Sequence, residues 1–283
     1  MNTVGVETTN HCNLKCITCP THERMKRRRG YMSEDVYKEV LRQLDCGSTK
    51  GNPLSVGLSN WGEPLLHPSI IDYINMASTR SFRTSLVTNG TLLNRDLSKR
   101  LMDSGLDELT FSIDGVGKAY EDIRGIPYNN IKNKIDEFLS IKETVGWKGS
   151  VRIRTVVCES NSSAFKEIYD EWKGHGIEFS IQREVLWKDA ERNDPCEFIK
   201  STIVVLWNGD IVPCCVDYDG ELNLGNVMTD NLFQVWDGKM EALRLNHIRG
   251  NYPSLCRKCT EWSGNTGDEY VGFRFKGRVR TEW

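Results

Sequence analysis

The first two-thirds of the chain alternate short apolar segments with longer amphipathic ones. Six short segments rich in β-branched and other apolar residues are predicted strands: 4–8, 54–58, 83–88, 109–113, 151–157 and 177–181. Five segments between them have helical spacing: 33–44, 69–79, 94–103, 130–145 and 163–173. Strands that alternate with helices are typical of a parallel sheet, so the sequence predicts the α/β class. Such a sheet is either doubly wound or curled into a barrel.

Polar, glycine-bearing turns follow the predicted strands and help to choose between these architectures. Residues 11–19 follow the first strand and residues 60–64 follow the second, while 88–90 and 112–115 end the third and fourth. In a (β/α) barrel, the chemistry lies on the loops that follow the strands. The placement therefore favours a barrel or partial barrel whose functional residues meet at one rim.

The first of these turns contains Cys12, Cys16 and Cys19 in a C-x3-C-x2-C pattern. Thiolates are soft ligands, and groups of them select zinc or iron–sulfur clusters. A 4Fe–4S cluster normally takes four cysteines, but the next one, Cys46, lies beyond a predicted helix. A cluster held by this triad would leave one iron open to chemistry.

Other metal chemistries remain compatible with the triad. A zinc site could add His11 or His22 to the three cysteines. An electron carrier would normally close its cluster with four cysteines, and ferredoxin spacing differs from that seen here. A non-catalytic zinc or iron–sulfur protein is thus the alternative from another functional class.

Composition excludes several other classes. The 283 residues include 37 Lys and Arg against 39 Asp and Glu, and this balance predicts no overall affinity for nucleic acid. No apolar stretch approaches the ~18 residues that a membrane span needs. Ten cysteines without an apolar signal segment indicate a reducing, cytoplasmic environment and metal ligation rather than disulfides.

A second cysteine set follows a change of pattern near residue 189. Residues 202–207 and 210–212 are predicted to form a hairpin around Asn208 and Gly209, and a helix is expected over 231–245. Four cysteines flank these elements: Cys196, Cys214, Cys256 and Cys259. Four thiolates suit structural zinc and an iron–sulfur cluster about equally. We expect two domains, 1–188 and a small α+β domain over 189–283, and leave the segment 264–283 without a prediction.

The loop with Cys12, Cys16 and Cys19 resembles that of radical S-adenosylmethionine (SAM) enzymes, although Thr18 stands where that family usually has an aromatic or bulky apolar residue. The resemblance implies a partial (β/α)6 TIM-type barrel. It also implies a 4Fe–4S cluster whose open iron chelates SAM, which is cleaved to a deoxyadenosyl radical that abstracts hydrogen from a substrate carbon. A flavodoxin- or ferredoxin-type protein would supply the electron.

The second cysteine set is similar to the SPASM or twitch extension of the same enzymes. That resemblance implies an auxiliary 4Fe–4S cluster on Cys196, Cys214, Cys256 and Cys259. Full SPASM domains carry seven cysteines for two clusters, and this chain has no cysteine after Cys259. One auxiliary cluster is therefore expected.

Several further residues match SAM-binding positions of the family. Gly62, Glu63 and Pro64 resemble its glycine-glycine-glutamate motif, with Trp61 in place of the first glycine. The resemblance assigns SAM contacts to these three and to Thr18, Asn89, Ser112, Asp114 and Arg124. All of these except Thr18 have an ordinary alternative: a helix-entry turn at 62–64, a local turn at Asn89 or at Ser112 and Asp114, and a surface arginine at Arg124.

The resemblance favours oxidation of the substrate, with the auxiliary cluster as electron acceptor. Epimerisation is the alternative, with Cys215 donating a hydrogen atom, as a cysteine does in radical epimerases. Cys46 and Cys158 are expected to be small buried residues.

The substrate is expected to be a sugar or other small molecule, because the barrel begins near Val4 without a preceding peptide-recognition segment. A peptide remains an alternative. A basic run over 24–29 lies next to the cluster loop, and it raises the hypothesis of an anionic sugar or a nucleotide as substrate.

Overall fold

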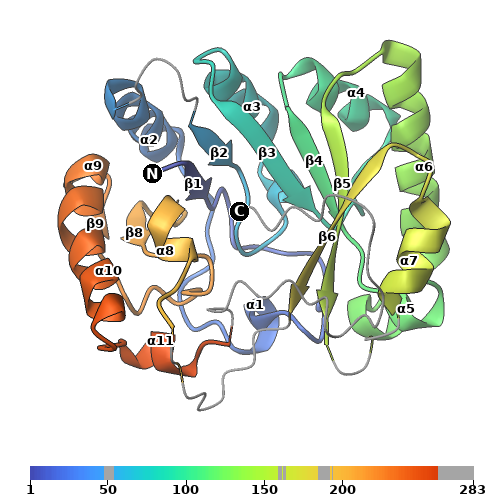
Figure 1. Cartoon of the computed structure of the whole chain (residues 1–283). Coiled ribbons are helices and arrows are strands. Elements are labelled where there is room, and N and C mark those ends of the chain that lie inside the picture. The colour runs from blue at the N-terminus through green and yellow to red at the C-terminus, as the bar shows by residue number, and fades with distance from the viewer. Residues whose placement is uncertain (48–53, 159–160, 162–163, 184–191, 193, 261–283) are drawn as a thin grey trace.

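A computed structural model describes residues 1–47, 54–158, 161, 164–183, 192 and 194–260. Within that part, one sheet has the strand order β6-β5-β4-β3-β2-β1-β7-β8-β9. Its strands are β1 (Thr3–Val6), β2 (Ser55–Gly57), β3 (Arg83–Thr88), β4 (Glu108–Ser112), β5 (Ser150–Val157), β6 (Ile177–Arg183), β7 (Thr202–Val205), β8 (Asp210–Val212) and β9 (Gly225–Asn226). Figure 1 shows the strands side by side in a curved sheet.

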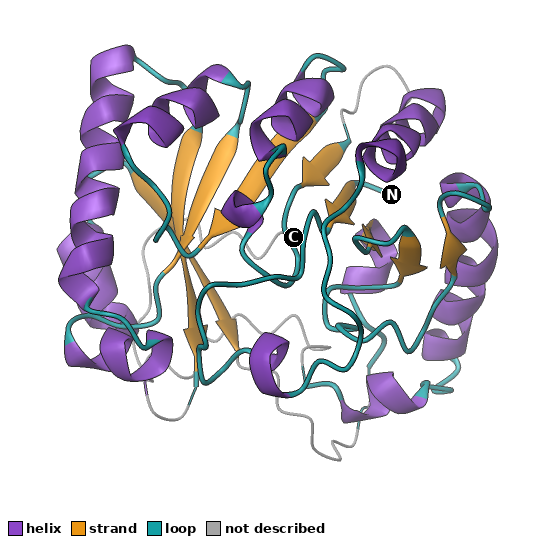
Figure 2. Ribbon diagram, turned by 180° about the vertical axis from the view of Figure 1, so that it is seen from behind, coloured by secondary structure: helices purple, strands orange, loops and turns teal. Residues whose placement is uncertain are grey.

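The strands β1 to β6 pair in chain order, and every pair is parallel. Helices connect them: α2 (Glu34–Gly47), α3 (Ile70–Ser78), α4 (Arg95–Asp103), α6 (Tyr128–Val145) and α7 (Ala164–Trp172). Figure 2 shows these helices along the outer side of the sheet. Since β6 and β9 form the two edges of the sheet, the barrel is partial, and the predicted fold class is confirmed.

Successive residues of a strand point to opposite faces, and the sequence uses this alternation. On β1, Val4 and Val6 are fully buried in the apolar core, whereas Thr3 and Gly5 line the interior cavity. The apolar face holds the helices by burying hydrocarbon surface. The other face leaves the inside of the barrel available for a ligand.

The chain after residue 189 continues the same sheet. β7 pairs in parallel with β1, and β8 pairs antiparallel with β7. Gly209, with φ +90°, makes the turn of the predicted hairpin. The expected helix over 231–245 consists of α9 (Leu232–Val235), a π-helical turn over Trp236–Met240 and α10 (Glu241–Ile248). The predicted boundary at 188/189 and the segment 264–283 lie outside the described residues, so the division into two domains stays a prediction.

Short helices were not predicted. They are α1 (Pro20–Glu23), α5 (Lys118–Arg124), α8 (Phe198–Ser201), α11 (Ser254–Lys258) and the 3₁₀ turn η1 (Pro64–Leu66). Elements of one or two turns are too short to show helical periodicity. No helix among the described residues is long and apolar enough to cross a membrane.

Candidate functional site

The two cysteine sets meet at one cavity of about 370 Å³ inside the barrel. Cys12, Cys16 and Cys19 line it from the loop after β1, and Cys214 and Cys215 line it from the segment after β8. The structure thus brings together residues that are about 200 positions apart in the sequence. No disulfide joins any of the ten cysteines, all of which lie among the described residues.

The first cysteine loop has an inner and an outer side. Cys12, Leu14, Cys16 and Thr18 line the cavity, whereas the residues between them, Asn13, Lys15 and Ile17, are exposed. The alternation turns Cys12 and Cys16 toward the cavity, which Cys19 also lines, and keeps the charged Lys15 in water. Thr18, the residue that departs from the family pattern, lies on the cavity side.

Polar donors accompany the thiols of this triad. The Asn89 amide Nδ2 lies 3.9 Å from Cys12 Sγ, and Arg124 Nη1 lies 3.7 Å from Cys16 Sγ. Burial raises the pKa of the Cys12 thiol to about 11. Metal binding requires the thiolate form and releases the proton, and the nearby donors favour the negative charge that results. The donor set therefore fits an iron–sulfur cluster.

Arg124 is positioned by a buried ion pair. Its Nη2 lies 2.5 Å from Asp114 Oδ2, while Asp114 Oδ1 accepts a hydrogen bond of 2.7 Å from the amide of Val156 on β5. The Asp114 side chain is fully buried and that of Arg124 is 10% exposed. Asp114 therefore acts on the cavity through Arg124, which lines it, and the alternative of a surface arginine is wrong.

Glu63 is fixed by local hydrogen bonds. Its Oε1 accepts from the Thr88 hydroxyl at 2.7 Å and from the Leu65 amide at 3.1 Å, and its Oε2 accepts from the Asn89 amide at 2.7 Å. Burial raises the pKa of this carboxyl to about 7. Glu63 joins the β2 turn to the end of β3, and the buried Pro64 begins the next turn. The carboxylate shapes the rim at which the resemblance expects SAM.

Gly62 lies against the backbone of the cluster loop. It has φ +107°, and a Cβ atom there would stand 2.5 Å from the carbonyl oxygen of Thr9 and 2.8 Å from that of His11. The amide of Glu63 donates to the same His11 carbonyl at 2.7 Å. A side chain at position 62 would push the β2 turn away from the cysteine loop.

We expect Gly62→Ala to lower the free energy of unfolding by about 1–3 kcal/mol through backbone strain alone, and further through the two close contacts. Gly146→Ala is the matched control, because Gly146 has φ +70° with open space around its Cβ position. Urea unfolding of both variants measures the difference. Equal losses would contradict the close approach at Gly62.

Asn89 and Ser112 both line the cavity. Asn89 donates to Asn13 Oδ1 at 3.0 Å, and its Oδ1 accepts from the Thr91 amide and hydroxyl. Asn89 is therefore both a turn residue and a cavity residue, and it holds the cluster loop. Ser112 lies opposite Arg154 in the pairing of β4 with β5.

The second cysteine set is more enclosed than the first. Cys196, Cys256 and Cys259 are buried, and Cys214 is half-buried at the cavity. Burial and the neighbouring thiols raise the pKa of Cys214, and burial raises that of Cys256 to about 12. Arg192 Nη1 donates to the Cys256 carbonyl at 2.9 Å. Four thiols, with the Arg192 guanidinium beside Cys256, have the donor chemistry of an auxiliary cluster, although no three or more His, Cys, Asp or Glu side chains of the described residues are arranged to hold a metal ion as they stand.

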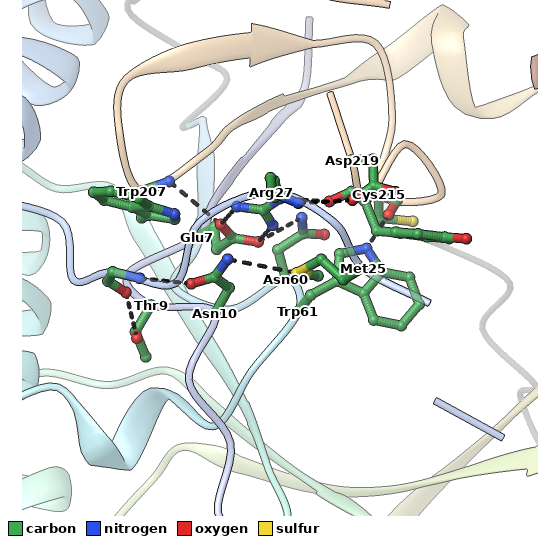
Figure 3. Close-up of polar contacts among 12 residues, drawn as sticks. Glu7, Thr9, Asn10, Met25, Arg27, Asn60, Trp61, Trp207, Cys215 and Asp219 are labelled. Atoms are coloured by element: carbon green, nitrogen blue, oxygen red, sulfur yellow. Dashed lines mark hydrogen bonds and ion pairs between the residues drawn. The ribbon is translucent and has the colours of Figure 1, made fainter. Parts of the chain in front are cut away.

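Polar contacts join the two cysteine regions, as Figure 3 shows. Arg27 forms a bidentate ion pair with Glu7, at the end of β1, and also donates to the Tyr218 carbonyl. The Lys26 amide donates to Asp219 Oδ1 at 2.7 Å. Burial raises the pKa of Glu7, and the hydrogen bonds from Arg27 oppose that shift. Residues directly after the first cysteine loop thus hold the segment after Cys214.

The basic run over 24–29 mostly serves this structural purpose. Arg27 is paired with Glu7, and Arg29 Nη1 donates to the Asn10 carbonyl at 2.9 Å. Arg24 lines the cavity, and Lys26 and Arg28 are exposed. The run therefore places one side chain, Arg24, at the cavity.

Trp61 makes a second connection between the two regions. Its Nε1 donates to the Cys215 carbonyl, and its ring meets that of Tyr218 edge-on, with 5.9 Å between the ring centroids. Trp61 also lines the cavity. The indole that replaces the first glycine of the motif therefore forms part of the wall between the cysteine sites.

Arg152, Arg154 and Glu108 line the cavity but were not predicted. The signal was present in β5, where Arg152 and Arg154 alternate with Val151 and Ile153. Charges at every second position of a strand in a parallel sheet indicate an inner face that is not packed with apolar side chains.

Three cysteines lie outside both sets: Cys215 lines the cavity, and Cys46 and Cys158 do not. Cys158 is buried, as predicted, but the prediction that Cys46 is buried is wrong, since Cys46 is exposed. Helix α2 buries Tyr37, Val40, Leu41 and Leu44. Position 46 falls beside that stripe, whose next members would be three or four residues after Leu44.

The chain belongs to the radical SAM superfamily, whose family model matches residues 6–171. A second model, for the SPASM iron–sulfur cluster-binding domain, matches residues 196–260. The protein is thus a radical SAM enzyme with a C-terminal SPASM iron–sulfur domain. These matches cover both cysteine sets and exclude the non-catalytic alternative.

Among curated relatives, the chain is 24% identical to a tungsten-containing aldehyde ferredoxin oxidoreductase cofactor-modifying protein of Pyrococcus furiosus, covering 96% of this chain and 90% of that protein. It is 21% identical to the S-adenosyl-L-methionine-dependent 2-deoxy-scyllo-inosamine dehydrogenase of Niallia circulans, covering 94% and 96%. Its match to an AdoMet-dependent heme synthase of Nitratidesulfovibrio vulgaris spans 43% of that protein.

Solved structures share the fold. BtrN in complex with AdoMet and 2-DOIA superimposes with a TM-score of 0.64 at 18% identity, covering 92% of this chain and 93% of that one. The enzyme anSMEcpe with bound AdoMet and the Cp18Cys peptide gives a TM-score of 0.67 at 15% identity, covering 95% and 93%.

Proposed function

We propose that the protein is a radical SAM dehydrogenase that oxidises a carbon of a polar small molecule. The observation that carries the proposal is the shared cavity, which is lined by all three cysteines of the first set and by Cys214 of the second. When bound, a 4Fe–4S cluster on Cys12, Cys16 and Cys19 would supply reductive cleavage of SAM, and one on the second set would accept an electron. The protein binds, orients and encloses the reactants.

In this proposal, SAM lies against the rim formed by the loops after β1 to β4. Thr18, Gly62, Asn89 and Ser112 border that space. Arg124, oriented by Asp114, offers a guanidinium to the SAM carboxylate, a charge-assisted contact. Glu63 also lines that space while its carboxylate holds the Thr88 hydroxyl and the Asn89 amide, and Pro64 begins the turn that follows.

The relatives support a dehydrogenase. The Niallia circulans dehydrogenase matches this chain over nearly the full length of both, and the SPASM match includes Cys196, Cys214, Cys256 and Cys259. A low-potential flavodoxin or ferredoxin would supply electrons, and a reducing cytoplasm would keep the ten cysteines from forming disulfides.

The test uses anaerobically reconstituted protein with dithionite, SAM and a panel of sugars, aminocyclitols and short peptides. The proposal predicts deoxyadenosine together with a product that has lost two hydrogen atoms. A product of unchanged mass with inverted configuration at one carbon would contradict the dehydrogenase proposal and support an epimerase.

The epimerase is the second candidate because the Cys215 thiol belongs to the cavity wall. Under that alternative, Cys215→Ala abolishes the inverted product while SAM cleavage continues, since the substrate radical loses its hydrogen donor. Under the dehydrogenase proposal, the same variant retains most of its oxidised product. Product analysis in deuterated water distinguishes the two, because a donated hydrogen leaves deuterium on the carbon.

Peptides form the alternative substrate class. The solved structure of anSMEcpe contains a peptide, and its fold resembles that of this chain. Turnover of a peptide and of no sugar or cyclitol in the same panel would favour this alternative.

A further inference from the structure

The cavity extends to the amino ends of the strands, far from the cysteine loop. There, cavity-lining residues begin neighbouring strands: Thr202 on β7, Thr3 on β1, Ser55 on β2 and Arg83 on β3. Pairing places them side by side, Thr202 with Thr3, Thr3 with Ser55, and Ser55 with Arg83. Together with Glu108 and Arg152, they form the amino-end belt.

Two positions further along these strands, small residues leave the interior of the barrel unfilled. Gly5 pairs with Gly57, and Gly57 pairs with Ser85, and all three line the cavity. The interior of a closed barrel is normally filled by bulky branched side chains at such positions. Here a ligand can reach from the rim down to the belt.

The belt contains buried polar atoms without partners among the described residues. They are Arg152 Nε and Thr202 Oγ1, on side chains of residues that are 5% and 8% exposed. A buried polar group without a partner costs free energy, and a ligand that accepts these hydrogen bonds would recover that cost.

The charges of this region favour an anion. Arg152 pairs with Glu108 and with Glu178, each at 2.8 Å, and Arg83 lies 3.6 Å from Glu108. Arg154 lines the cavity one step above the belt. Burial, followed by the charge of Arg152, lowers the pKa of Arg154 to about 10. Five arginines (24, 83, 124, 152 and 154) and two glutamates (63 and 108) line the cavity, so cationic side chains outnumber carboxylates in its wall.

We propose that the amino-end belt, with Arg154, is an anchoring site for an oxyanion of the substrate, a phosphate or a carboxylate. On β5, Arg152 is five residues from the last residue, Val157, which corresponds to roughly 16 Å of strand. The anchored group therefore lies well away from the carbon that reacts near the rim. Planar guanidinium groups suit such bidentate recognition. This inference rests on the proposed function and names the substrate class.

The experiment measures binding without requiring turnover. Anaerobically reconstituted enzyme is titrated calorimetrically with glucose, glucose 6-phosphate and glucuronate, three probes that differ in charge and in the source of the oxyanion. We expect at least one charged probe to bind about tenfold more tightly than glucose, about 1.4 kcal/mol. Which of the two binds better distinguishes phosphate from carboxylate.

Variants locate the site. Arg154→Met and Thr202→Val should each remove most of the preference for the charged probe, while iron content and circular dichroism stay unchanged. Thr202→Val keeps the shape of the side chain and so serves if Arg154→Met fails to fold. Arg28→Met is the surface control and should retain the preference.

Arg24→Met tests whether the charged probe binds at the mouth of the cavity instead of at the belt. The proposal would be overturned if the preference for a charged probe survived in both Arg154→Met and Thr202→Val and disappeared in Arg24→Met. Equal affinity for glucose and both charged probes would also overturn it. Charge-selective binding without any SAM cleavage would leave the anchoring site in place and contradict the dehydrogenase, so the two failures are distinguishable.

Discussion

Cys16→Ala is expected to abolish deoxyadenosine formation and to reduce the iron content by about four atoms per chain, the content of one 4Fe–4S cluster. The triad has no spare thiol within its loop, so the remaining Cys12 and Cys19 leave two irons without protein ligands. The second set retains its four cysteines and its iron. Anaerobic reconstitution, iron analysis and chromatography of the SAM cleavage products provide the measurement.

Cys46→Ala is the matched control. Cys46 is exposed on α2 and is not among the residues that line the cavity, so both iron content and SAM cleavage should equal those of the native protein. Deoxyadenosine formation by Cys16→Ala at the native rate would contradict the assignment of the triad.

Arg27→Met is expected to lower the free energy of unfolding by about 3–5 kcal/mol, the usual cost of leaving a buried charge without its partner. The Glu7 side chain is fully buried and that of Arg27 is 13% exposed. The variant also removes the hydrogen bond to the Tyr218 carbonyl. Urea unfolding of the reconstituted protein at neutral pH gives the change in free energy.

Two further variants show whether this loss of stability comes from the Glu7–Arg27 ion pair. Arg28→Met removes an exposed cation next to Arg27 and should change stability by less than about 0.5 kcal/mol. Combining Glu7→Gln with Arg27→Met removes both charges and should recover part of the stability. A loss as small as that of Arg28→Met would mean that the Glu7–Arg27 pair does not hold the two regions together.

The sequence predicted the barrel because its signals are local. Each strand and long helix carries its own periodicity, and β3 has the predicted bounds, 83–88. The triad is also local, since three thiols within eight positions share one loop. The assignment of the second cysteine set to an iron–sulfur cluster depends on the resemblance to the SPASM extension, because the spacing of the cysteines alone does not distinguish an iron–sulfur cluster from zinc.

Long-range contacts account for what was not predicted. β7 pairs with β1 across about 200 residues, and Arg27 reaches Tyr218 across 191. Neither contact leaves a periodic trace in the sequence. The hydrogen bonds of the Glu63 carboxylate with Thr88, at the end of β3, and Asn89, directly after it, are contacts of the same kind, and the SAM contact of Glu63 stays a prediction.

The central claim is that each cysteine set holds one 4Fe–4S cluster at a shared cavity. Metal and acid-labile sulfide analysis of the anaerobically reconstituted protein tests it most directly. The account predicts about eight irons and eight sulfides per chain. Zinc in place of iron, without sulfide, would contradict it.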